Sequence, residues 1–74
     1  MQVTILSLEK TLFSGEANTL VVPSVTGVLT ILKDHMPLIT ELTKGTIEVD
    51  KQTFDIESGI LEVARQKTTI LIRK

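Results

Sequence analysis

The sequence predicts an all-β protein: a flattened antiparallel β-sandwich of two sheets. Three observations favour this fold class. Apolar and polar residues alternate with a period of two in several segments, as in Ile47-Glu48-Val49. β-branched residues are abundant, and turn residues separate the apolar runs at short intervals. No segment shows the i, i+3, i+4, i+7 apolar spacing of an amphipathic helix, so many short strands remain as the interpretation.

In the first half of the chain, apolar runs such as Leu20-Val21-Val22 lie between turn residues. Ser14-Gly15, Pro23-Ser24 and Thr26-Gly27 are expected to be turns, as is the segment 34–37. These positions predict strands at 2–7, 10–13, 17–22, 28–32 and 38–43.

In the second half, the period-two pattern itself identifies the strands. Ile47 and Val49 alternate with polar residues in a strand at 46–50, and Phe54 and Ile56 do so at 53–57. The same pattern predicts strands at 60–64 and 68–73. Lys44-Gly45, Asp50-Lys51, Ser58-Gly59 and Gln66-Lys67 separate these runs, and Lys44-Gly45 is interpreted as a hairpin turn.

The length of 74 residues predicts one domain, spanning 1–74. A domain this small has marginal stability, and without cysteine it has neither disulfides nor thiolate metal sites. A single histidine argues against a histidine-built metal site. Stability must therefore come from an apolar core, a docked partner, or both. The expected inward residues are Ile5, Leu20, Val22, Leu29, Ile31, Ile47, Val49, Phe54, Ile56, Leu61, Val63, Ile70 and Ile72.

Composition argues against two other classes of partner. The net charge is −1 and only two aromatic residues are present, so neither the basic excess nor the stacking platform of a nucleic-acid-binding protein is seen. Uninterrupted apolar runs do not exceed three residues, whereas a membrane-spanning helix needs about 20. The first residues lack the pattern of a signal peptide. We expect a soluble chain without direct membrane insertion.

Three candidate chemistries have simpler interpretations. Lys44-Gly45-Thr46 has the wrong order for a phosphate loop and lacks the upstream glycine. Asp34-His35 lacks a surrounding nucleophile motif, and His35 is expected to have a packing or contact role. The carboxylate pairs Glu48/Asp50 and Asp55/Glu57 fit a solvated strand face. We therefore expect a binding module that is not an enzyme and carries no cofactor or metal.

Apolar residues in two loop-like stretches give the best clue to binding. Val25, Val28 and Met36 belong to no obvious core strand. Exposed apolar side chains of this kind often mark a partner surface. An equally good interpretation is that they close the open end of the sandwich, and the residues alone do not separate the two.

The order of motifs resembles the epsilon subunit of F-type ATP synthases over essentially the whole chain. The motifs are Leu12-Phe13-Ser14-Gly15-Glu16, Val21-Val22-Pro23, Gly27 with Leu29, Ile31 and Leu32, His35-Met36-Pro37-Leu38-Ile39-Thr40, Leu42 with Lys44-Gly45, Ser58-Gly59-Ile60-Leu61-Glu62-Val63, and Thr69-Ile70-Leu71. The resemblance implies a ten-stranded sandwich at the foot of the central stalk. It further implies a non-catalytic rotor part that links the gamma subunit to the membrane rotor ring and couples proton or sodium transport to ATP synthesis.

The resemblance also implies where the partners bind. Two stretches match the family's loops at the rotor-ring end: Ser24, Val25, Thr26, Gly27 and Val28, and then Lys33, Asp34, His35 and Met36. The region from His35 to Thr43, including Leu42, would lie near gamma. We expect Val25, Val28, His35 and Met36 to meet at one end of the sandwich and to face the ring. The implied location is peripheral, on the cytoplasmic face of a bacterial plasma membrane or the equivalent face in an organelle.

Two departures from the family pattern limit what is carried over. Family members often have an acidic residue where this chain has Val28, so an apolar contact replaces a charged one. We expect the chain to lack the helical hairpin that follows the sandwich in longer members, so the ATP-sensing and inhibitory functions of that hairpin are not assigned. Two alternative functions remain: a free-standing sandwich module that binds protein or carbohydrate, and a small β-barrel enzyme with a polar cleft around His35.

Overall fold

The computed structural model describes residues 1–33 and 36–73, and every regular element in these ranges is a β-strand. Period-two alternation of apolar residues accounts for most of the strands. They are β1 (Gln2–Leu6), β2 (Thr11–Glu16), β3 (Thr19–Ser24), β4 (Gly27–Leu32), β5 (Leu38–Leu42), β6 (Gly45–Val49), β7 (Gln52–Ile56), β8 (Ser58–Val63) and β9 (Lys67–Arg73). The all-β prediction is confirmed. These nine strands correspond one for one to those expected from the residue pattern, and their number is close to the ten that the resemblance implies.

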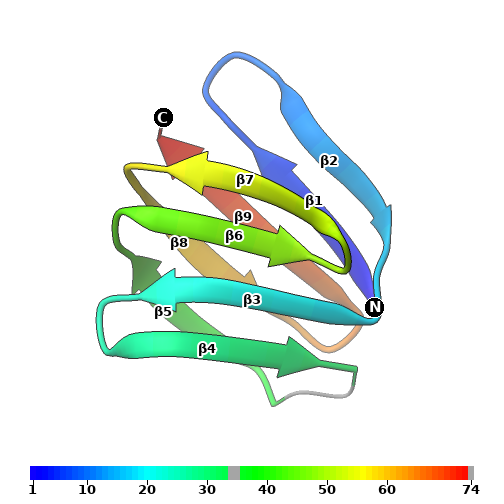
Figure 1. Cartoon of the computed structure of the whole chain (residues 1–74). Helices are drawn as coiled ribbons and strands as arrows, with labels where there is room; N and C mark the ends of the chain where they lie inside the picture. Colours follow the sequence, from blue (N-terminus) through cyan, green and yellow to red (C-terminus); the bar gives the residue numbers. More distant parts are fainter. Residues whose placement is uncertain (34–35, 74) are drawn as a thin grey trace.

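The strands form two layers of one curled sheet. One layer contains β4, β3, β6 and β7, and the other contains β5, β8, β9, β1 and β2. Figure 1 shows the first layer in front of the second. All the strand pairs are antiparallel except β1 with β9, which is parallel.

The two layers are continuous at a corner where β5 leads into β6. β3 pairs with β6 at Leu20 and Val21, and then with β5 at Ser24 alone. Between these two pairings, the backbone N–H of Thr43 donates to the carbonyl of Pro23 at 2.8 Å. Pro23 lies where the ladder with β6 has already ended, so its missing N–H costs little. β5 and β6 do not pair with each other, so the predicted hairpin turn at Lys44-Gly45 is wrong.

Three other predicted turns also lie inside strands, and one of them, Ser58-Gly59, begins β8. Gly15 is extended in β2 and opposes Val3 of β1, and Ser24 ends β3 and opposes Gly27 of β4. Turn-forming residue types do not prevent a strand when neighbouring strands supply the hydrogen bonds. The turn near Thr26 is real, because Gly27 has a φ of 127°, which favours glycine.

The apolar core fills the space between the layers. The expected inward residues are buried, except that Leu29 and Phe54 are half-buried. Val3, Ala17 and Leu42 also belong to the core. The Phe13 ring of β2 meets the Phe54 ring of β7 edge to face, with centroids 6.3 Å apart, and so bridges the two layers where their edges face each other.

Gly59 of β8 lies too close to β9 to accept a side chain. A Cβ atom at this position would be 2.7 Å from the backbone oxygen of Leu71 and 3.4 Å from the Cα of Ile72. Backbone atoms of a central strand do not move aside, so Gly59→Ala is expected to cost about 1–3 kcal/mol of unfolding free energy.

Urea denaturation measures this cost, and Gly15→Ala is the matched control. A Cβ at Gly15 would be 3.8 Å from the Phe13 ring, an ordinary van der Waals contact. Equal stability of the two variants would contradict the close approach of β8 and β9 at Gly59.

Candidate partner-binding surface

The turn between β3 and β4 forms an exposed corner that carries apolar side chains. We call Val25, Thr26, Gly27 and Val28 the 25–28 corner. Within it, Val28 is 73% exposed and Val25 is 58% exposed. The interpretation that these residues close the open end of the sandwich is therefore wrong, because closing residues would be buried.

The corner is held in shape by the buried side chain of Ser24. Its hydroxyl donates to the carbonyl of Gly27 and accepts a hydrogen bond from the backbone N–H of Thr26 at 3.3 Å. The backbone N–H of Val25 donates to the carbonyl of Glu41 at 3.1 Å, which ties the turn to β5. These bonds fix the turn backbone, so Val25 and Val28 are presented from a defined position.

Two of the expected contact residues lie inside the domain. Ser24 and Leu42 are each 3% exposed, and they oppose each other where β3 meets β5. The Ser24 side chain supports the 25–28 corner from within, and neither side chain forms part of the exposed surface.

The expected meeting of the two loops at one end of the sandwich is wrong. β4 begins at Gly27, opposite Ser24, and ends at Leu32, opposite Thr19. Lys33 follows that far end, whereas Val25 and Val28 lie at the near end. Only one strand separates the two loops, and adjacent turns of an antiparallel sheet lie at opposite ends. Figure 1 shows β4 running away from the turn that joins it to β3.

The second loop is therefore a separate exposed region. Met36 is 77% exposed, and Lys33 is exposed as well. Asp34 and His35, which were also expected to contact a partner, lie outside the described residues.

A second apolar surface was missed by the sequence interpretation. Ile39 of β5, Ile60 of β8 and Leu71 of β9 are exposed on the outer face of the second layer, and Ile39 is 71% exposed. Ile60 is directly opposite Leu71, and Leu71 is opposite the half-buried Leu6 of β1. We call Leu6, Ile39, Ile60 and Leu71 the outer patch.

A signal for the outer patch was present in the sequence. Consecutive apolar residues in a strand point to both faces of the sheet, because successive side chains alternate. Leu38-Ile39, Ile60-Leu61 and Ile70-Leu71-Ile72 all have this property. Leu8, at the tip of the β1–β2 hairpin, is another apolar side chain that the interpretation missed, and it is 90% exposed.

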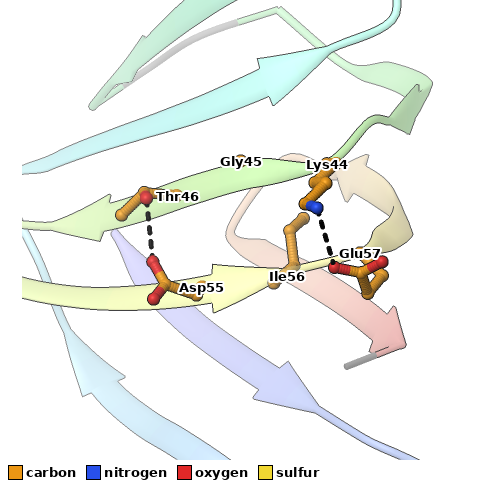
Figure 2. Close-up of a pocket in the computed structure, with 6 residues that line it drawn as sticks. All are labelled: Lys44, Gly45, Thr46, Asp55, Ile56 and Glu57. Carbon is orange, nitrogen blue, oxygen red and sulfur yellow. Dashed lines mark hydrogen bonds and ion pairs between the residues drawn. The ribbon is translucent and has the colours of Figure 1, made fainter.

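The hollow around Lys44-Gly45-Thr46 does not have the form of a phosphate site. It has a volume of about 500 Å³ and is lined by residues at the start of β6 and the end of β7. Figure 2 shows the Lys44 Nζ directed at Glu57, 3.8 Å from its carboxylate, and the Thr46 hydroxyl donating to Asp55 at 2.9 Å. Gly45 is part of the β6–β7 ladder, so this segment forms no loop of free N–H groups.

Within residues 1–33 and 36–73, no cluster of three histidine, cysteine or acidic side chains is arranged to hold a metal ion. The same residues form no helix that is long and apolar enough to cross a membrane.

The closed apolar core and the two exposed apolar surfaces define the class of the protein as a small all-β domain. Residues 1–74 match the family described as the β-sandwich domain of the ATP synthase delta/epsilon chain. The chain belongs to this family. A domain of this family is a structural part of the ATP synthase and not its catalytic subunit.

Individual relatives support the same assignment. The chain is 37% identical over 75 residues to the ATP synthase epsilon chain of Chromohalobacter salexigens, covering 95% of this chain and 53% of that one. It is 33% identical over 72 residues to the epsilon chain of Chlorobaculum tepidum, covering 90% of this chain and 82% of that one. The chain thus spans little more than half the length of several relatives.

Solved structures share the fold. A chain in the central stalk/c-ring structure of the Tetrahymena thermophila mitochondrial ATP synthase matches with a TM-score of 0.85 at 16% identity, covering 100% of this chain and 63% of that one. A chain in the Euglena gracilis mitochondrial ATP synthase, in a structure containing OSCP, F1 and the c-ring, matches with a TM-score of 0.88 at 16% identity. It covers 97% of this chain and 49% of that one.

Proposed function

We propose that this domain is a non-catalytic rotor part of an F-type ATP synthase. It links the gamma subunit to the membrane rotor ring and so couples proton or sodium transport to ATP synthesis. The observation that carries the proposal is the presence of two separate apolar surfaces, the 25–28 corner and the outer patch, on one domain with a closed core. A part that transmits torque between two partners needs two binding surfaces and a rigid body between them.

The 25–28 corner is the proposed contact with the rotor ring. Val25 and Val28 project from a turn whose backbone is fixed by Ser24 and Glu41. Apolar anchors held in a fixed position lose little conformational entropy on binding. Val28, where the family often has an acidic residue, makes this contact one of apolar packing rather than of charge.

The outer patch and the loop before β5 are the proposed contact with gamma. Met36 and Ile39 are exposed on either side of Pro37. On β8 the exposed Glu62 lies opposite Ile39, and Ile60 lies opposite Glu41 and Leu71, so the apolar side chains of this contact are bordered by two carboxylates. Lys33, Asp34 and His35 precede Met36 in the chain and belong to the same proposed contact. Leu42 supports it from within the core rather than by direct contact.

The proposed location follows from these partners. A domain bound to both gamma and the ring lies peripherally at the membrane, on the side that carries the catalytic head. In a bacterium this is the cytoplasmic face of the plasma membrane.

Co-purification from the protein's own cells tests the proposal. A tagged copy of the complete protein is expected to bring down gamma and the catalytic subunits of the ATP synthase. An untagged strain gives the background. Recovery of carbohydrate-processing proteins or of no synthase subunit would instead favour a free-standing binding module.

A further inference from the structure

β4 is an edge strand whose outer edge is open. In the part of the chain that the structure describes, β4 pairs only with β3. Figure 1 shows β4 as the last strand of its layer. Unpaired N–H and C=O groups along such an edge can bind another strand.

The hydrogen bonds of β3 show which residues of β4 face that open edge. On the side of β3 that faces away from β4, the carbonyls of Thr19 and Pro23 accept hydrogen bonds and the N–H of Val25 donates one, at 2.8 to 3.1 Å. The partners of these groups lie in the β6–β7 turn and in and just after β5. Backbone groups alternate in direction along a strand, so the even-numbered residues of β3 bond toward β4. Their partners are Gly27, Leu29 and Ile31. The remaining residues of β4, namely Val28, Thr30 and Leu32, therefore direct their N–H and C=O groups away from β3.

This edge lacks the features that usually prevent strand addition. β4 contains no charged residue and no proline, and its register with β3 is unbroken. The other two edge strands differ. β2 has an irregular register with β1 and ends at Glu16, and β7 carries the exposed Asp55. The Phe13–Phe54 contact further occupies the space between β2 and β7. β4 is the unprotected edge of the domain.

The side chains of β4 are complementary to a second copy of the same strand. If two copies pair antiparallel about Thr30, then Val28 of each copy opposes Leu32 of the other, and Thr30 opposes Thr30. All three side chains are exposed on the same face. On the inner face, the half-buried Leu29 would oppose Ile31. Apolar–apolar and Thr–Thr pairs are favourable cross-strand neighbours, and no like charges are opposed.

We propose that the β4 edge binds a second copy of this chain, as an antiparallel two-fold pair centred on Thr30. The two β4-containing layers then form one continuous sheet. This pairing rests on the geometry of β4 and not on the rotor-ring contact. Val28 belongs to both surfaces, however, so a domain paired through β4 cannot at the same time use Val28 to bind the ring.

Sedimentation equilibrium of the chain over a range of concentrations tests the pairing. A single strand pair is a small interface, so we expect a dissociation constant on the order of 100 µM. The average mass should rise from that of the monomer at low concentration to nearly twice that value well above the dissociation constant. In NMR spectra, the amide signals of Val28, Thr30 and Leu32 should shift with concentration.

Charge variants at Thr30 test the two-fold register. Thr30→Lys alone and Thr30→Glu alone are each expected to remain monomeric, because like charges are then directly opposed. An equimolar mixture of the two should recover the dimer, because Lys then faces Glu. Thr53→Lys is the matched control, since Thr53 is exposed on the β7 edge strand of the same layer, and it should dimerise like the wild type.

Three results would overturn the proposal. A wild-type chain that stays monomeric at millimolar concentration shows that the edge does not bind its own copy. Dimerisation that persists in Thr30→Lys places the interface elsewhere. Failure of the Lys/Glu mixture to recover the dimer shows that Thr30 does not face Thr30.

Discussion

Replacing Leu61 with alanine is expected to remove a large part of the domain's stability. The Leu61 side chain is fully buried, and its strand β8 lies between β5 and β9. Deleting a buried leucine side chain costs about 2–5 kcal/mol, through lost burial and the cavity left behind. Native domains are stable by only about 5–15 kcal/mol, and one of this size lies toward the lower end.

Urea denaturation of the variant measures this loss, and Ile60→Ala is the matched control. Ile60 is the neighbouring residue on the same strand, but it is half exposed on the opposite face. We expect Ile60→Ala to change the unfolding free energy much less than Leu61→Ala. If Ile60→Ala proved the more damaging of the two, β8 would present its other face to the core.

Placing negative charge on the 25–28 corner is expected to uncouple ATP hydrolysis from ion pumping. In the double variant Val25→Asp, Val28→Asp, two apolar anchors become carboxylates that are costly to bury in an interface. Anchors of this kind typically contribute about 1–3 kcal/mol each. Membranes containing the variant synthase should hydrolyse ATP yet pump at least several-fold fewer ions per ATP than the wild type, measured by a fluorescent indicator of the ion gradient.

The purified variant domain should retain nearly the wild-type melting temperature, because both side chains are exposed. Val28→Thr, which keeps the shape of the side chain without adding charge, serves as the matched control and should remain coupled. A double variant that is stable and fully coupled would show that the rotor ring binds another part of the domain. Early melting would show that the corner contributes to the folded state more than its exposure indicates.

Much of the fold is contained in local sequence pattern. A period-two alternation assigns each side chain to a face, and so Ile47, Val49, Leu61, Val63 and Ile70 were correctly predicted to be buried. Such a pattern does not say which strands pair. The link between β5 and β6 carries turn residues typical of a hairpin, yet the chain crosses there from one layer to the other.

The candidate surfaces were less predictable because they depend on that pairing. The apolar character of Val25, Val28 and Met36 fitted both exposed contact residues and residues that close the sandwich, and only the structure shows that all three are exposed. Their placement at one end was wrong, because β4 alone separates the two loops. The outer patch arises only when Ile60, Leu71 and Leu6 become neighbours across three strands, and no local segment contains that information.

Single-cysteine cross-linking in the assembled synthase is the most direct test of the proposed rotor function. The chain contains no cysteine, so Val28→Cys and Ile39→Cys each introduce one unique attachment point for a photoreactive maleimide. We predict that the adduct formed from position 28 contains the subunit of the membrane rotor ring and that the adduct from position 39 contains gamma. Adducts with neither subunit, in a synthase preparation that contains the labelled chain, would contradict the proposal that this domain links gamma to the ring.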